Sequence, residues 1–188
     1  MAEERWIPNK FESDEEICIK AFIKFTQFKS LKKYFRITGA TEYGTMCDVV
    51  GENKTGGTVV VELKHREDKS TGFTDCFIEV GKYNNLMKLY GKGCLPMYLN
   101  IIGDCYWLWI LPSVPENTMK LYKNVPIKSS ISGKKIVDRY GLQWQHAWVF
   151  DSKGNIIQES SCKHNIPNPP IHHDIDFNKI TNDTLNKL

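Results

Sequence analysis

The sequence predicts an α/β domain in which a central mixed β-sheet is flanked by helices in three layers. Segments with helical and strand patterns follow one another in the order helix, strand, strand, strand, helix, strand, strand. One strand segment holds three consecutive valines, residues 59–61, a run that is typical of a central strand buried on both faces. The length of 188 residues is that of one domain with its own core.

The first third of the chain contains the clearest elements. Apolar residues at positions 18, 21, 22, 25 and 28 recur with a helical period, which predicts a helix over residues 14–34. Strands are expected at residues 46–50 and 58–64. They are joined by a hairpin turn at residues 51–57, where the sequence reads GENKTGG.

The middle of the chain predicts a second helix between further strands. Residues 65–72 are polar and indicate a loop, and residues 73–80 indicate a short strand or an extended lead-in. A helix is expected over residues 82–90, where glycines follow its last turn. Residues 96–102 and 105–111 predict a hairpin of two strands around a Gly-Asp turn.

The last third of the chain has a weaker pattern. Residues 120–132 are basic and rich in Ser and Lys, and the segment around residues 151–155 predicts a further hairpin. The stretch NIPNPPIHHDIDF has three prolines and predicts an extended arm or a partly disordered one. We therefore expect a single domain over residues 1–188. Its core would span about residues 14–111, and a C-terminal elaboration over residues 112–188 would add a β-hairpin and an extended tail.

The charged residues are distributed unevenly along the chain, and this distribution indicates the kind of ligand that the protein binds. The net charge is +3, yet residues 20–36 carry six basic side chains and no acid, whereas acids gather in residues 48–79. Basic surface for phosphates beside carboxylates for a metal is what a nucleic-acid enzyme needs.

The six cysteines lack metal-ligand spacing, so free thiols in a reducing cytosol are expected. No apolar run would span a membrane, and MAEERWIPNK is not a signal peptide, so we expect a cytoplasmic protein.

Asp48, Glu62 and Lys64 form the candidate site. Asp48 precedes the expected turn and Glu62 follows it, so a twisted or bulged hairpin brings both carboxylates to one edge of the sheet. Because side chains alternate along a strand, Glu62 and Lys64 point to the same face. Mg²⁺ prefers oxygen ligands, so Asp48, Glu62 and the backbone carbonyl of Leu63 are the expected metal ligands. Such a metal would assist phosphodiester hydrolysis, and Lys64 would orient the attacking water or stabilise the phosphate.

The segments CDVV and VVVELK, with an Asp before a hairpin and Glu-x-Lys on the next strand, resemble the PD-(D/E)xK nuclease superfamily. Cys47 stands where that family usually has proline. The resemblance implies a restriction-endonuclease-like three-layer core in the order αβββαβ over about residues 14–111. It also implies metal-dependent cleavage of DNA, less often of RNA, with Mg²⁺ as the cofactor and Mn²⁺ as its substitute.

The resemblance implies two further site residues. Many members of the family carry a metal-binding glutamate on the first helix. Here Glu15 is preferred to Glu16, because it lies nearer the expected buried side of that helix. In several branches a polar residue at the start of the second core helix faces the active site. Lys82 is preferred to Glu79 for this position, where it would contact the scissile phosphate.

The expected function is therefore that of a Mg²⁺-dependent endonuclease acting on DNA. The small single domain resembles Holliday junction resolvases and phage-encoded nucleases, which suggests a structure-selective enzyme in a bacterial or phage-infected cytoplasm. Such resolvases are dimers because a junction is cut at two symmetric positions, so a homodimer is one expected state of this protein. Two alternatives also stay open. One is a non-catalytic nucleic-acid or protein-binding module on a nuclease fold, and the other is a restriction-type or repair endonuclease with a sequence preference.

Three other features have simpler interpretations. Trp107 and Trp109 alternate along an expected strand and are interpreted as packing residues rather than base-stacking platforms. The His-His-Asp sequence at residues 172–174 lies in the Pro-flanked tail without a matched metal ligand. His65 directly follows the Glu-x-Lys strand and would either contact the substrate or cap the loop.

Overall fold

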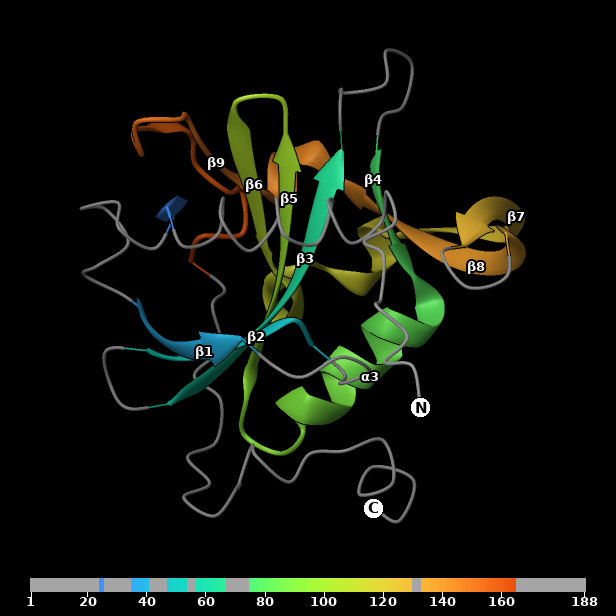
Figure 1. Ribbon diagram of the computed structural model, residues 1–188, viewed down its shortest axis with the longest axis horizontal. Coiled ribbons are helices and arrows are strands. Elements are labelled where there is room, and N and C mark those ends of the chain that lie inside the picture. The colour runs from blue at the N-terminus through green and yellow to red at the C-terminus, as the bar shows by residue number, and fades with distance from the viewer. Residues whose placement is uncertain are drawn as a thin grey trace, which may run out of the picture.

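The computed structural model describes residues 24–25, 35–40, 47–53, 57–66, 75–129 and 133–164 (Figure 1). This part of the chain is a mixed α/β fold with a mostly sheet core and one α-helix, α3, besides the two helical residues 24–25. A seven-stranded sheet has the order β1-β2-β3-β5-β6-β9-β10, and a three-stranded sheet has the order β4-β8-β7. None of the described helices is long and apolar enough to cross a membrane.

The elements have the following bounds. The first sheet contains β1 (Phe35–Ala40), β2 (Val49–Asn53), β3 (Thr58–Arg66), β5 (Leu95–Ile102), β6 (Cys105–Ile110), β9 (Trp148–Phe150) and β10 (Ile156–Gln158). The second sheet contains β4 (Asp75–Glu79), β7 (Lys120–Ser129) and β8 (Gly133–Gln143). The helix α3 spans Val80–Tyr90, and short 3-10 helices occupy Leu111–Ser113, Glu116–Thr118 and Trp144–His146.

Strand β3 lies in the interior of the first sheet, as its valine run predicts. It pairs antiparallel with β2, where Val49 faces Val61, and parallel with β5. Residues 59–61 are all buried, and they alternate between the two hydrophobic clusters on opposite faces of the sheet. Burial on both faces favours a run of branched apolar residues over alternation. The strand continues to Arg66, into residues that were expected to form a loop.

Helix α3 joins β4 to β5 and confirms the helix expected over residues 82–90, with a start two residues earlier. Tyr83, Leu86 and Leu89 recur at helical spacing and are buried in one cluster with side chains from both sheets. This cluster holds the helix against the sheets and fixes the position of its first turn. After the helix, Gly93 has a φ of 94°, a conformation that glycine adopts without strain.

The second sheet is the main feature that the sequence did not predict. The strand or lead-in expected at residues 73–80 is β4, but it pairs with β8 and not with the first sheet. The basic segment at residues 120–132 contributes to a long hairpin of β7 and β8, which reaches to one side of the molecule in Figure 1. A register shift between Tyr122 and Val125, with Asn124 at a φ of 55°, interrupts the alternation of β7. The period of two that marks a strand is therefore broken in the sequence.

Other expectations have mixed outcomes. The hairpins β5–β6 and β9–β10 are confirmed. Strand β2 begins later than expected and continues to Asn53, inside the segment expected to be a turn. The first sheet gains β1 as its third antiparallel strand, in place of the strand expected at residues 73–80. The helix expected over residues 14–34 lies outside the described residues except at 24–25, which are helical, and so does the tail beyond residue 164.

Gly141 is a position of the second sheet that leaves no room for a side chain. A Cβ atom placed there would lie 2.6 Å from Oδ2 of Asp75 and 2.9 Å from the Tyr122 ring. Gly141→Ala is therefore expected to lower the free energy of unfolding by about 1–3 kcal/mol, measured by urea denaturation. Gly81→Ala on α3 is the matched control, because a Cβ atom there meets nothing within 4 Å. Equal stability of Gly141→Ala and the wild type would refute this tight packing.

Candidate active site

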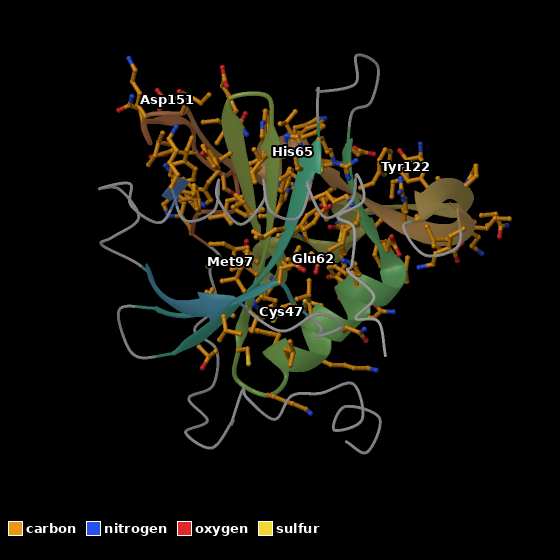
Figure 2. The ribbon with its side chains drawn as sticks, viewed as in Figure 1. Cys47, Glu62, His65, Met97, Tyr122 and Asp151 are labelled. Atoms are coloured by element: carbon orange, nitrogen blue, oxygen red, sulfur yellow. The ribbon has the colours of Figure 1, made fainter. Side chains whose placement is uncertain are left out.

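The candidate active site lies where β3 passes the start of β2 and the first turn of α3. Figure 2 shows Glu62 and Cys47 in this region, between β3 and α3. The N–H of Asp48 donates to the carbonyl of Val61 at 3.0 Å, and the N–H of Leu63 donates to Oδ2 of Asp48 at 2.6 Å. Asp48 thus continues the pairing of β2 beyond its first ladder residue. Its carboxylate is held against β3, next to Glu62.

Glu62 is the buried acid of this site, with 4% of its surface exposed. Burial, and then the charge of Asp48, raise the pKa of Glu62 from 4.5 to about 7, although Lys82 and Lys64 oppose the increase. Structural carboxylates on a protein surface do not titrate near neutral pH. A strongly raised pKa beside a second carboxylate is a feature of functional sites.

Lys82 reaches the carboxylates from the first turn of α3 and forms an ion pair with Glu62. Desolvation of its ammonium lowers the pKa of Lys82, but the charges of Glu62 and Asp48 outweigh this and raise that pKa above its usual 10.5. Lys82 is therefore charged throughout the physiological range. It neutralises part of the negative charge that Asp48 and Glu62 bring together.

Lys64 lies two residues after Glu62 on β3, so both side chains point to the same face of the sheet. Glu62 is buried and Lys64 is exposed, and the charge of Lys64 lowers the pKa of Glu62. Asp48, Glu62, Lys64 and Lys82 therefore come together from three elements, with Lys64 at the side open to solvent.

The other residues that the sequence singled out do not join this site or lie outside the described residues. Glu79, the alternative to Lys82, forms an ion pair with Lys135 of β8 at 3.1 Å and does not join Glu62. Glu15 and Glu16 lie outside the described residues, as do residues 172–174. His65 lies within β3, and not after the end of the strand as expected.

A polar cluster next to the site was not expected from the sequence. Arg66 donates from Nε to Oδ1 of Asn100 at 2.9 Å and from Nη2 to the carbonyl of Phe77 at 3.0 Å. The hydroxyl of Tyr98 donates to the same carbonyl at 2.8 Å. These bonds join β3 and β5 of the first sheet to β4, the edge strand of the second. The alternation of positions 62, 64 and 66 was visible in the sequence, but the partners of Arg66 were not.

The tryptophans and cysteines have the structural roles that the sequence predicts. Trp109 is fully buried, and its Nε1 donates to the carbonyl of Gln143 at 3.1 Å. The rings of Trp107 and Trp144 meet edge to face with centroids 4.8 Å apart. The five described cysteines are free thiols. Burial, followed by the charges of the two nearby carboxylates, raises the pKa of Cys47 to about 12, so its thiol is not a nucleophile at neutral pH.

Asp48, Glu62 and the backbone carbonyl of Leu63 are the oxygen donors with which this site would hold a metal. Within the described residues, no three His, Cys, Asp or Glu side chains gather around one point. Mg²⁺ needs only one or two carboxylates, because it retains several waters as ligands. Burial, and then the charge of Asp48, raise the pKa of Glu62, so the surroundings stabilise the charge of Glu62 poorly. A divalent cation therefore fits this donor set.

Comparisons with protein-family models, curated proteins and solved structures give no match for this chain. The chemistry of the site is therefore the basis for assigning a function. Its components are a buried carboxylate that titrates near neutral pH, a second carboxylate, and two lysines from different elements.

Proposed function

We propose that this chain is a metal-dependent nuclease that hydrolyses phosphodiester bonds in DNA, with a core of the PD-(D/E)xK type. The observation that carries the proposal is the juxtaposition of Asp48 and Glu62, with Lys64 on the same face of β3. The strand arrangement supports such a core. Strands β1, β2 and β3 are antiparallel neighbours, and β5 runs parallel to β3 after α3. Strand β4 departs from the family order, because it pairs in the second sheet.

Each residue of the site has a distinct task in this proposal. Asp48, Glu62 and the Leu63 carbonyl would hold Mg²⁺ or Mn²⁺, and Glu15 would complete the ligand set. A bound cation would neutralise developing charge and lower the pKa of an attacking water. Lys64 positions that water or the phosphate through a charge-assisted hydrogen bond. Lys82 favours the ionised form of Glu62 through their ion pair and lies close enough to the site to meet the phosphate.

One observation favours a second function, that of a non-catalytic binding module. Lys82 already pairs with Glu62, so the buried carboxylate has a positive partner without any metal. In that case the four charged residues would stabilise the fold and a binding surface, and no divalent cation would change the stability of the protein.

Lys64→Gln separates these two functions. Because Lys64 is exposed, we expect this variant to fold and to bind nucleic acid nearly as the wild type does. Its cleavage rate should fall by about a hundredfold or more, the effect of removing one group that stabilises the transition state. The assay is cleavage of duplex, single strand, flap and four-way junction DNA with Mg²⁺, Mn²⁺ or EDTA. Lys88→Gln, at an exposed position of α3, is the matched control.

The outcomes separate the interpretations. Cleavage that survives in EDTA or in Lys64→Gln would contradict the nuclease proposal. Binding by the wild type without cleavage of any substrate would favour the binding module. A preference for the four-way junction would support a resolvase-like homodimer, whereas cleavage of one duplex sequence would support a restriction-type enzyme.

A further inference from the structure

The outer face of the second sheet carries two aromatic rings flanked by basic side chains. Its adjacent rows are Phe77–Gly141–Lys120 and Glu79–Arg139–Tyr122. The rings of Phe77 and Tyr122 meet edge to face with centroids 5.0 Å apart. The ammonium of Lys120 lies 4.8 Å from the centre of the Tyr122 ring, and the guanidinium of Arg139 lies 5.9 Å from that of Phe77. We call Phe77, Lys120, Tyr122 and Arg139 the platform.

The face that carries the platform has more positive than negative charge, because three cations, Lys120, Lys135 and Arg139, lie beside two acids, of which one is buried. Asp75 accepts a hydrogen bond from the Tyr122 hydroxyl at 2.8 Å, and Glu79 pairs with Lys135 at 3.1 Å. In the described part of the chain, no carboxylate lies within ion-pair distance of Lys120 or Arg139. Lys120 is exposed and the other three members are half-buried. Two cations and two rings are thus presented together to an anionic ligand.

Arg66 connects the platform to the candidate active site. It follows Glu62 by four residues on the same face of β3, a distance of about 13 Å along the strand. Its guanidinium donates to the carbonyl of Phe77, the residue whose ring belongs to the platform. Burial, and then the charge of Arg66, lower the pKa of Arg139, which indicates that the two guanidinium groups lie near each other. A polyanion that passes from the platform to Glu62 would relieve this repulsion.

We propose that the platform binds a single-stranded segment of nucleic acid beside the cleavage site. Lys120 and Arg139 would contact phosphates, and the rings of Tyr122 and Phe77 would stack on bases. This inference rests on the proposed function and adds the substrate class to it. Bases in a duplex do not expose their faces, whereas an unpaired strand offers faces and phosphates together. Stacking a base on a ring is stronger than the exposed cation–π contact that it replaces, so the Lys120 ammonium moves to a phosphate.

The test is binding without cleavage, so that it is independent of catalysis. The probe is a fluorescein-labelled oligothymidine of about twelve nucleotides, within the range of single-strand site sizes. Its affinity is measured by fluorescence anisotropy in EDTA over a series of salt concentrations.

The variants separate the ring from the charge. Tyr122→Leu removes the ring, and Tyr122→Phe keeps the ring but loses the hydroxyl. Lys120→Gln removes one phosphate contact. Lys153→Gln is the matched control, because Lys153 is an exposed lysine in the turn with Asp151, which Figure 2 shows on the opposite side from Tyr122.

The expected result is that Tyr122→Leu weakens binding by roughly tenfold, the loss of one stacked base, whereas Tyr122→Phe binds as the wild type does. Lys120→Gln should reduce the slope of log affinity against log salt by about 0.7, and Lys153→Gln should leave it unchanged. Because Lys120 is exposed, Lys120→Gln tests binding by the platform even if Tyr122→Leu does not fold.

The proposal is overturned if the wild type does not bind the oligothymidine, or if neither Tyr122→Leu nor Lys120→Gln changes the affinity. Equal binding of an oligoglutamate peptide would overturn it as well, because the surface would then be one for acidic protein.

The result is also separable from the nuclease proposal. Binding that depends on Tyr122, without cleavage of any substrate, would support the platform and contradict the nuclease. Metal-dependent cleavage that Tyr122→Leu and Lys120→Gln leave unchanged, on single strands and flaps alike, would contradict only the platform.

Discussion

Glu62→Gln is expected to abolish metal-dependent cleavage and, at the same time, to make the protein more stable above pH 7. Folding buries the Glu62 carboxylate beside Asp48 and raises its pKa from 4.5 to about 7. Between these two pH values the folded state binds more protons than the unfolded state, so stability falls as the pH rises. This decrease in stability is complete at pH values above the pKa that Glu62 has in the folded state. Glutamine has a similar shape without the charge, and so removes this loss.

The expected gain in the free energy of unfolding at pH 8 follows from the same shift. A change from 4.5 to about 7 corresponds to about 3 kcal/mol, and the effect of Lys82 is already contained in it. Urea denaturation of the wild type and the variant at pH 5 and pH 8 measures the difference. At pH 5 most of the gain should disappear, because Glu62 is then protonated in the folded state and the pH lies only slightly above the unfolded-state pKa of 4.5. Glu79→Gln is the matched control, because it breaks only the partly exposed ion pair with Lys135.

The loss of cleavage has a separate cause. Removing a metal ligand removes several kcal/mol of transition-state stabilisation, which corresponds to a rate at least about a hundredfold lower. Added Mg²⁺ should raise the melting temperature of the wild type and leave that of Glu62→Gln unchanged. If Glu62→Gln were instead less stable at both pH values, the buried carboxylate would be a structural partner of Lys82, and the proposed active site would lose its main support.

The parts of this site that the sequence predicts are those that one hairpin determines. The valines at residues 59–61 identify β3 as a buried strand, and alternation then puts Glu62 and Lys64 on one face. The position of Asp48 next to Glu62 is predicted as well, because a hairpin brings the chain back to the same edge of the sheet. What alternation cannot distinguish is their exposure, for Glu62 is buried and Lys64 is exposed. That difference depends on α3, whose first turn brings Lys82 to Glu62 but does not cover Lys64.

The parts that the sequence does not predict depend on distant pairings. Arg66 contacts Asn100 and Phe77, which are 34 and 11 residues away, and only the packing of the two sheets brings these residues together. The basic segment of β7 is indistinguishable from a solvated loop until β8 pairs with it, because its bulge interrupts the alternation. The preference for Lys82 over Glu79 came from the family resemblance. In the structure it follows from geometry, since Glu79 is the last residue of β4 and faces Lys135.

Lys82→Met is expected to move the acidic limb of the pH–rate profile to higher pH. In the wild type, Glu62 must lose its proton to act as a ligand, so kcat/KM should fall as the pH decreases through about 7. The charge of Lys82 lowers the pKa of Glu62, and methionine removes that charge while keeping an unbranched side chain. An opposite charge at this range lowers the pKa of an acid by about 1–3 units, so its loss should raise the midpoint of the limb by at least about one unit.

The consequence is a defect that depends on pH. At pH 7 the rate for Lys82→Met should be at least about fivefold below that of the wild type, and at pH 9 much of the difference should disappear, because Glu62 is then largely ionised in both proteins. Measurement of kcat/KM from pH 5 to pH 9.5 distinguishes this from direct contact between Lys82 and the phosphate. Direct contact alone would lower the rate by the same factor at every pH and leave the midpoint unchanged. Lys88→Met, on the same helix and exposed, should reproduce the wild-type profile. A midpoint that does not move in Lys82→Met would therefore mean that the ion pair does not set the charge of Glu62.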